Sequence, residues 1–346
     1  MKNLDKNVNS IKKQKVICLL GPTAIGKSDL AIDLAKAFGF EIIGADSMQI
    51  YRGLDVGTGK VTKEQAGEIA HHMIDILDPS DEYSAGQFVK DAGILIKQIA
   101  KRKGQSALVF DDKTEREKSG FDKEADKKGL GVPLIVGGTG LYVQALLSGH
   151  DFAQAPKDTQ LRQKLTEILK QNGAEHLHNL LKECDEVSAQ KIFPNDTKRV
   201  IRALEVYYSM GKKLSDLNQI NRQNATSEYD YLCIVLQQDR QILYERINKR
   251  VDKMVENGLI KEVQNLFEKY QDKPYQFCQA IGYKELFEHL RGNCTLLEAI
   301  ENIKRNSRRY AKRQITFFKH MPIDKIFIDG DYFNQAKILI EKFLSA

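Results

Sequence analysis

The sequence lacks the features of a membrane or secreted protein. None of the apolar runs in its 346 residues approaches the roughly 18 residues of a membrane-spanning helix, and its mean hydropathy is −0.44. The lysine-rich start has no apolar segment of the kind that signal peptides carry. We therefore expect a cytoplasmic protein that makes no membrane contact.

Cysteine is sparse and scattered. The five cysteines are odd in number and never occur as C-x-x-C, so the sequence supports neither a disulfide framework nor a zinc ribbon. The neighbouring histidines (His71 and His72, His176 and His178) have no set of thiols or carboxylates around them in the sequence. We expect reduced thiols and no zinc site.

The net charge is also modest. The chain has 53 Lys and Arg against 47 Asp and Glu, which leaves +6 and does not by itself indicate a polyanionic partner. The length favours one large domain that carries a second, smaller one.

The strongest motif that is present is a glycine-rich loop. An apolar run from Val16 to Leu20 predicts a buried strand, and the next eight residues match G-x-x-x-x-G-K-[ST]. A helical pattern follows and ends at Gly39. This strand–loop–helix context predicts a phosphate site, in which backbone N–H groups and Lys27 hold the anion and Ser28 binds Mg²⁺. The predicted diphosphate- or nucleotide-binding residues are Gly21, Pro22, Thr23, Ala24, Ile25, Gly26, Lys27 and Ser28.

Such a loop does not identify a reaction. It fits a kinase, an NTPase or a transferase that uses a diphosphate donor. Asp111 and Asp112, which follow an apolar run, would suit the acidic Mg²⁺ site of a small-molecule kinase. An RNA-binding NTPase is a third possibility, because seven Lys or Arg and no acid lie between Lys304 and His320.

Further segments resemble one family. D-S-M-Q-I-Y begins at Asp46 after a predicted strand, G-G-T-G-L-Y begins at Gly137 after another, and K-R-Q-I-T begins at Lys312. From about Val16 to about Lys319 the chain resembles the bacterial tRNA dimethylallyltransferases, also called tRNA isopentenyltransferases. The resemblance implies an α/β fold: a P-loop NTPase-like core with a mainly parallel sheet flanked by helices, plus a small inserted all-helical domain.

The resemblance also implies a reaction and its partners. A dimethylallyl group would pass from dimethylallyl diphosphate to N6 of the adenosine 3′-adjacent to the anticodon, in tRNAs that read codons beginning with U. The tRNA anticodon stem-loop would be the second substrate, Mg²⁺ the cofactor, and the protein a monomer. Prenylation of free AMP is disfavoured by the tRNA-binding segments.

Three residues match catalytic positions of that family. Asp46 would be the general base for a weakly nucleophilic amine, Thr139 would contact the donor or the tRNA, and Arg162 would serve the same site. Each has a structural alternative: a strand-end cap for Asp46, a turn residue for Thr139 and a surface residue for Arg162.

The resemblance further implies a tRNA-binding set, since the target base must turn out of the anticodon loop. Gln49 would bond the edge of that base. Arg309 and Arg313 lie on one face of a predicted basic helix. The full set is Asp46, Ser47, Met48, Gln49, Thr139, Arg162, Lys198, Arg199, Val200, Ile201, Arg202, Gln279, Ile281, Gly282, Tyr283, Lys284, Arg309, Lys312, Arg313 and Gln314.

The predicted organisation is a core of residues 14–151 and 227–330, interrupted by a helical, tRNA-clamping insertion at 152–226. A charged insertion at 105–131 stands where the family has a short loop, and we expect it to lie at the surface.

Overall fold

The structure, a computed structural model, describes residues 13–103, 130–149, 158–223, 227–270 and 273–346. Contacts divide the chain into two units, one of residues Met1–Leu147 and Glu228–Ala346 and one of Ser148–Ser227. No helix among the described residues is both long and apolar enough to cross a membrane.

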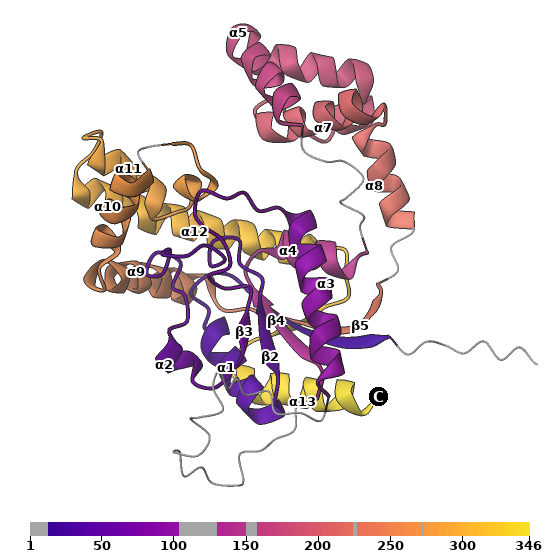
Figure 1. Ribbon diagram of the computed structural model, residues 1–346, viewed down its shortest axis with the longest axis vertical. Coiled ribbons are helices and arrows are strands. Elements are labelled where there is room, and N and C mark those ends of the chain that lie inside the picture. The colour runs from indigo at the N-terminus through magenta and orange to yellow at the C-terminus, as the bar shows by residue number, and fades with distance from the viewer. Residues whose placement is uncertain (1–12, 104–129, 150–157, 224–226, 271–272) are drawn as a thin grey trace, which may run out of the picture. The chain divides into compact units, whose positions relative to one another are not determined.

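A six-stranded parallel sheet forms the centre of the first unit (Figure 1). Its strands are β1 (Gln14–Leu20), β2 (Glu41–Gly44), β3 (His71–His72), β4 (Pro133–Gly137), β5 (Tyr229–Leu236) and β6 (Ile326–Ile328). They lie in the order β3-β2-β4-β1-β5-β6, so β1 pairs with both β4 and β5. The middle strands are buried on both faces, which is why they are continuous apolar runs.

Helices cover both faces of this sheet. The helices of this unit are α1 (Lys27–Phe38), α2 (Lys63–Ala66), α3 (Ala85–Lys101), α4 (Gly140–Leu147), α9 (Arg240–Glu256), α10 (Leu259–Tyr270), α11 (Tyr283–Leu290), α12 (Leu296–His320) and α13 (Tyr332–Ser345), with a 3₁₀ turn, η3 (Gln276–Gln279). Alternate β1 residues face different cores, because side chains alternate along a strand. Cys18 joins the core with α3, α4 and α10 to α12, whereas Leu19 joins the core with α1 and α13.

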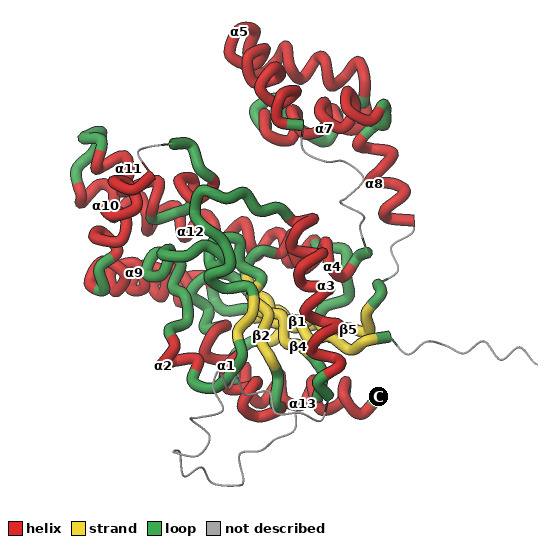
Figure 2. Tube along the Cα trace, viewed as in Figure 1, coloured by secondary structure: helices red, strands yellow, loops and turns green. Residues whose placement is uncertain are grey.

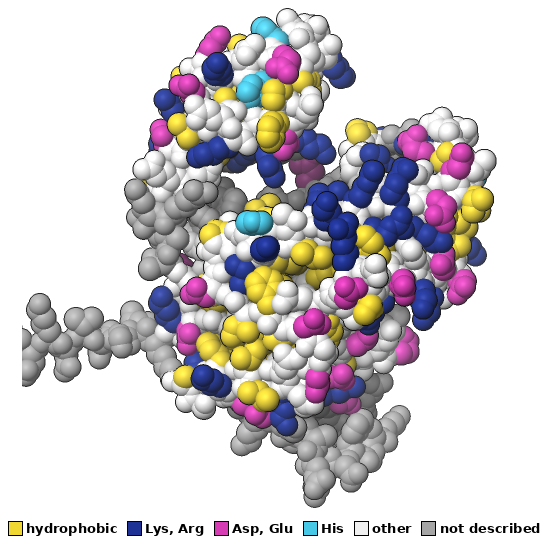
Figure 3. All heavy atoms as spheres, turned by 180° about the vertical axis from the view of Figure 1, so that it is seen from behind, with side chains coloured by type: hydrophobic (Ala, Val, Ile, Leu, Met, Phe, Trp, Pro, Cys, Tyr) yellow, Lys and Arg dark blue, Asp and Glu magenta, His cyan; other side chains and the backbone are white. Residues whose placement is uncertain are grey.

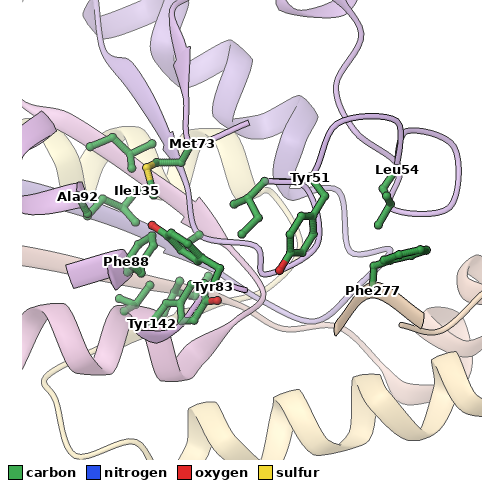
Figure 4. Close-up of a cluster of buried hydrophobic side chains, with 14 of the residues drawn as sticks. Tyr51, Leu54, Met73, Tyr83, Phe88, Ala92, Ile135, Tyr142 and Phe277 are labelled. Atoms are coloured by element: carbon green, nitrogen blue, oxygen red, sulfur yellow. The ribbon is translucent and has the colours of Figure 1, made fainter. Parts of the chain in front are cut away.

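The first of these cores supports the carboxyl ends of the strands. Figure 4 shows its aromatic residues, in which Phe88 of α3 stacks on Tyr142 of α4 with ring centroids 4.7 Å apart. Tyr51 and Phe277 are fully buried in the same core, although they are more than 200 residues apart. This packing anchors the loops that follow β2 and β4.

The second unit is helical (Figure 2). It consists of α5 (Thr159–Cys184), α6 (Glu186–Ala189), α7 (Thr197–Met210) and α8 (Leu214–Gln223). Gly173 interrupts α5 with a φ of 83°. Leucines of α5 pack on Val200 and Leu204 of α7 to form a separate small core. This unit holds the predicted insertion, residues 152–226.

The predicted fold class is confirmed, and the strands predicted before the glycine-rich loop, before Asp46 and before Gly137 appear as β1, β2 and β4. The edge strands β3 and β6 were not predicted. Helix α13 also lies beyond residue 330, where the predicted core ended. Asp111, Asp112 and nearly all of the charged insertion fall outside the described residues.

Candidate active site

The candidate site lies at the carboxyl ends of β1, β2 and β4, where parallel sheets collect their ligands. The glycine-rich loop, residues 21–28, joins β1 to α1. Asp46 follows β2, and Thr139 follows β4. The fold therefore brings together three segments that span more than 100 residues of the sequence.

The glycine-rich loop has the backbone conformation of an anion cradle. Gly26 caps α1 with a φ of 98°, and Ala24 is also left-handed with a φ of 65°. Lys27 Nζ donates to the Pro22 carbonyl oxygen over 2.7 Å. Burial, followed by the nearby Arg250 charge, lowers the pKa of Lys27 to about 7, although Asp46 opposes the shift. A bound anion would place a negative charge beside this amine and stabilise its protonated form.

Asp46 stabilises the turn that follows β2, and Thr139 links that turn to the end of β4. Asp46 Oδ1 accepts hydrogen bonds from the N–H groups of Met48 (2.9 Å) and Gln49 (3.4 Å). Thr139 Oγ1 accepts from Ser47 N–H over 3.2 Å, and its own N–H donates to the Ala45 carbonyl. Among the described residues none donates a hydrogen bond to Asp46 Oδ2. This oxygen can therefore accept a proton without breaking the turn.

Two cavities meet at Asp46. A small one, of about 100 Å³, is lined by the glycine-rich loop residues Lys27 and Ser28 and by Gln49. A larger one, of about 380 Å³, is bordered by mostly apolar side chains, among them Met48 and Met254. Asp46 and Arg250 line both cavities. The site thus pairs a cationic compartment with an apolar one, and a carboxylate stands at their junction.

Two residues of this junction were not predicted. Arg250 of α9 donates from Nη2 to the Thr58 carbonyl oxygen over 3.0 Å, and burial lowers its pKa although Asp46 opposes the shift. Tyr310 of α12 lines both cavities, and burial and then Asp46 raise its pKa to about 12. Arg250 sits on a helix without a recognisable motif, and Tyr310 lies on α12 just before the K-R-Q-I-T segment, so only the fold reveals their place in the site.

Some of the predicted RNA-binding residues of the first unit are exposed, and others are buried. Arg309, Lys312 and Arg313 are exposed on α12, and Figure 3 shows a dense group of Lys and Arg side chains on this unit. Gln279 and Lys284 are also exposed, and Ile281 is partly buried. Several of these residues border the larger cavity, which places a basic surface beside its opening.

Gln314 and Tyr283 are both buried, and each borders one cavity of the site, Gln314 the small one and Tyr283 the larger one. Gln314 accepts from Thr23 N–H and donates to the Gly138 carbonyl oxygen, each over 2.9 Å. Its side chain therefore joins the glycine-rich loop to the glycine segment after β4 while it borders the small cavity, and its role in tRNA binding stays a prediction. Tyr283 donates its hydroxyl to Glu262, and its neighbour Gly282 is buried as well. The side chain of Tyr283 thus has a structural position.

The second unit holds Arg162 and the segment 198–202. Arg162 donates twice to the buried carboxylate of Glu205, from Nε (2.7 Å) and Nη2 (2.9 Å), and Arg202 donates to the same group. Lys198 and Arg199 are exposed and Ile201 is partly buried. Val200 is fully buried in the core of this unit, so its side chain serves packing there, and its place in the predicted tRNA-binding set stays a prediction. The catalytic role of Arg162 stays a prediction.

The site offers few side chains to a metal ion. No cluster of three His, Cys, Asp or Glu suited to a metal occurs in the part of the chain that the structure describes. Ser28 and Asp46 both border the small cavity. This set fits Mg²⁺, which retains waters and takes oxygens from a bound phosphate, and does not fit an ion that needs an all-protein shell.

Comparisons with known proteins point in one direction. The family model described as IPP transferase matches residues 49–110 and 121–321. The tRNA dimethylallyltransferase of Thermoanaerobacter sp. (strain X514) is 42% identical over 325 residues, which cover 94% of this chain and 95% of that protein. The enzyme of that name from Bacillus pumilus (strain SAFR-032) is 43% identical over 308 residues, covering 89% and 87% of the two chains.

Solved structures agree. The full-length tRNA isopentenylpyrophosphate transferase of Bacillus halodurans is 38% identical with a TM-score of 0.62, covering 96% of this chain and 95% of that one. A eukaryotic dimethylallyltransferase, studied as it acts on tRNA, is 32% identical with a TM-score of 0.74, covering 96% and 80%.

Proposed function

The chain belongs to the IPP transferase family, and we propose on that basis that it prenylates tRNA. It transfers a dimethylallyl group from dimethylallyl diphosphate to N6 of the adenosine 3′-adjacent to the anticodon and releases diphosphate. The tRNAs that read codons beginning with U are its substrates. One observation carries this proposal: a carboxylate stands where a cationic compartment meets an apolar one.

Asp46 is the general base of this reaction. The amine of the adenine forms a bond to C1 of the dimethylallyl group while the bond between C1 and the diphosphate oxygen breaks. The amine proton passes to Asp46, because Met48 and Gln49 use only Oδ1. Their N–H groups also keep the carboxylate oriented throughout the transfer.

The leaving diphosphate is held by the glycine-rich loop. Backbone N–H groups of the loop, Lys27 and Arg250 supply positive charge to its oxygens in the small cavity. Ser28 would hold Mg²⁺ beside them, and the ion would neutralise further charge on the leaving group. The phosphates of ATP present similar oxygens, so nucleotide binding at this loop is part of the proposal.

The acceptor base enters the larger cavity. Its apolar walls suit a base turned out of the anticodon loop and a prenyl group beside it. Arg309, Lys312 and Arg313 bind the RNA backbone near the opening, and Lys198 and Arg199 of the second unit bind it elsewhere. The protein acts as a monomer in the cytoplasm.

The proposal is tested by mass spectrometry of nucleosides from tRNA that has been incubated with dimethylallyl diphosphate and Mg²⁺. We expect N6-dimethylallyladenosine from the native protein and a loss of at least about 100-fold in rate with Asp46→Ala, because a positioned base contributes that much or more. Asp33→Asn, an exposed acid on α1, is the matched control. Absence of the product with native protein refutes the function, and equal rates with Asp46→Ala remove Asp46 from the mechanism.

A further inference from the structure

The segment Asp55–Thr58 lies between the two cavities and is held from outside the sheet by one side chain. Glu262 of α10 accepts hydrogen bonds from three consecutive backbone N–H groups, those of Asp55 (3.0 Å), Val56 (2.7 Å) and Gly57 (3.0 Å). Its Oε1 also accepts from the Tyr283 hydroxyl over 2.7 Å. Consecutive N–H groups that converge in this way form an anion-binding concavity, and here a carboxylate of the protein fills it.

The other side of this segment presents a carbonyl oxygen to the site. Thr58 O accepts from Gln49 Nε2 over 3.2 Å and from Arg250 Nη2 over 3.0 Å. A carbonyl oxygen has two lone pairs, and these two donors use both. Any shift of Thr58 therefore moves two side chains that border the small cavity.

The packing around this segment leaves little tolerance for movement. A Cβ placed on Gly57 would lie 2.6 Å from the Tyr283 hydroxyl oxygen, and one placed on Gly59 would lie 2.2 Å from Arg250 Nη2. Gly59 also has a φ of +60°, which disfavours a side chain independently. Tyr283 thus packs closely on the backbone at Gly57, and Arg250 packs closely on it at Gly59.

We propose that Glu262 is a positioning residue for the transfer reaction: by holding the N–H groups of residues 55–57 it fixes Thr58 O, and through that oxygen it orients Arg250 toward the diphosphate. The inference rests on the proposed function, and it assigns a role to a residue that contacts neither substrate. A misplacement of a charged group by about 1 Å in such a site costs as much as 100-fold in rate.

The conservative variant Glu262→Gln tests this role. Its amide nitrogen must face either the Asp55 and Val56 N–H groups or the Gly57 N–H and the Tyr283 hydroxyl, so donors oppose donors and the segment shifts. We expect kcat/KM for dimethylallyl diphosphate to fall about 10- to 100-fold, with the affinity for tRNA unchanged. Glu268→Gln, which makes the same change at an exposed acid on the same helix, should retain nearly full activity.

A double-variant cycle separates positioning from general destabilisation. In an Arg250→Ala background, Glu262→Gln should lower kcat/KM by less than about 3-fold, because the group it positions is already absent. Losses that multiply in the double variant, or a native kcat/KM in Glu262→Gln alone, overturn the proposal. If Glu262→Gln does not fold, Gly57→Ala displaces the same segment against Tyr283 and must show the same dependence on Arg250.

Binding of inorganic diphosphate, measured by calorimetry, distinguishes this proposal from the proposed function. Glu262→Gln should weaken diphosphate binding about 10-fold even if the native protein forms no prenylated nucleoside. That pattern would refute the prenyl transfer and leave the positioning role standing. If instead the native protein prenylates tRNA and Glu262→Gln binds diphosphate as tightly as native protein, the proposed function stands and the positioning role is refuted.

Discussion

The pKa of Lys27 predicts how donor binding depends on pH. Burial and the Arg250 charge lower this pKa to about 7, so the ammonium group loses its proton within the physiological range. A diphosphate binds the protonated form, and its affinity must therefore follow the charged fraction of Lys27 in the free protein. The perturbation we choose is Lys27→Arg, since a guanidinium stays charged at every pH of the experiment.

The magnitude follows from that value. With a pKa of about 7, the charged fraction is about 0.9 at pH 6 and about 0.1 at pH 8. The native protein should thus lose about 10-fold in affinity between these pH values and about another 10-fold by pH 9. Lys27→Arg should bind more weakly at pH 6, because its fork cannot reproduce the geometry of one amine, but it should not lose affinity through residue 27 as the pH rises.

The assay is calorimetric binding of a thiolodiphosphate analogue of the donor to both proteins from pH 6 to pH 9. The analogue itself titrates, so the ratio of the two dissociation constants at each pH is the quantity to compare. A ratio that changes by about 100-fold across this range supports the reasoning. A ratio that stays constant would show that Lys27 remains charged in the free protein, and the argument from burial would then be wrong.

Two further predictions concern the RNA surface and the second unit. Arg309→Glu or Arg313→Glu should weaken tRNA binding and reduce the slope of log K against log salt concentration by about one, while diphosphate binding is retained. The control Lys337→Glu should leave this slope unchanged. An unchanged slope in Arg309→Glu or Arg313→Glu would contradict the proposed contact with an RNA phosphate. In the second unit, burial acts to raise the pKa of Glu205, but the hydrogen bonds from Arg162 and Arg202 outweigh it and the pKa lies below its usual value. The stability that this charge supplies is present above the usual glutamate pKa and is lost as the pH falls through the lower folded value. The melting temperature of Glu205→Gln should therefore fall less on acidification than that of native protein. The control Glu183→Gln should lose as much as native protein. An equal loss in Glu205→Gln would refute this assignment.

The sequence was most informative where local chemistry and chain position coincide. The glycine-rich loop needs its residues in order, and a buried strand before it and a helix after it can be seen in the apolar pattern. The roles of Asp46 and Thr139 were predicted from the family resemblance, and each residue also follows a strand of the parallel sheet, where ligands collect. The structure brings all three segments to one edge of the sheet.

Residues that enter the site from distant helices could not be predicted. Arg250 is one of several basic residues on α9, and only the packing of that helix aims it at Thr58. Gln314 and Tyr283 show the opposite difficulty, because a family motif does not reveal whether a side chain points outward or inward. The short strands β3 and β6 were missed because two or three residues carry no period.

The hydrogen bonds of Gln314 have a consequence for the order in which the protein is made. Thr23 leaves the ribosome early, but the side chain that accepts its N–H group is synthesised 291 residues later. The same is true of β1, whose partner β5 is more than 200 residues further along the chain. Contacts of such long range form slowly. A nascent chain that stalls before α12 therefore carries the glycine-rich loop without the hydrogen bond that Gln314 makes to Thr23.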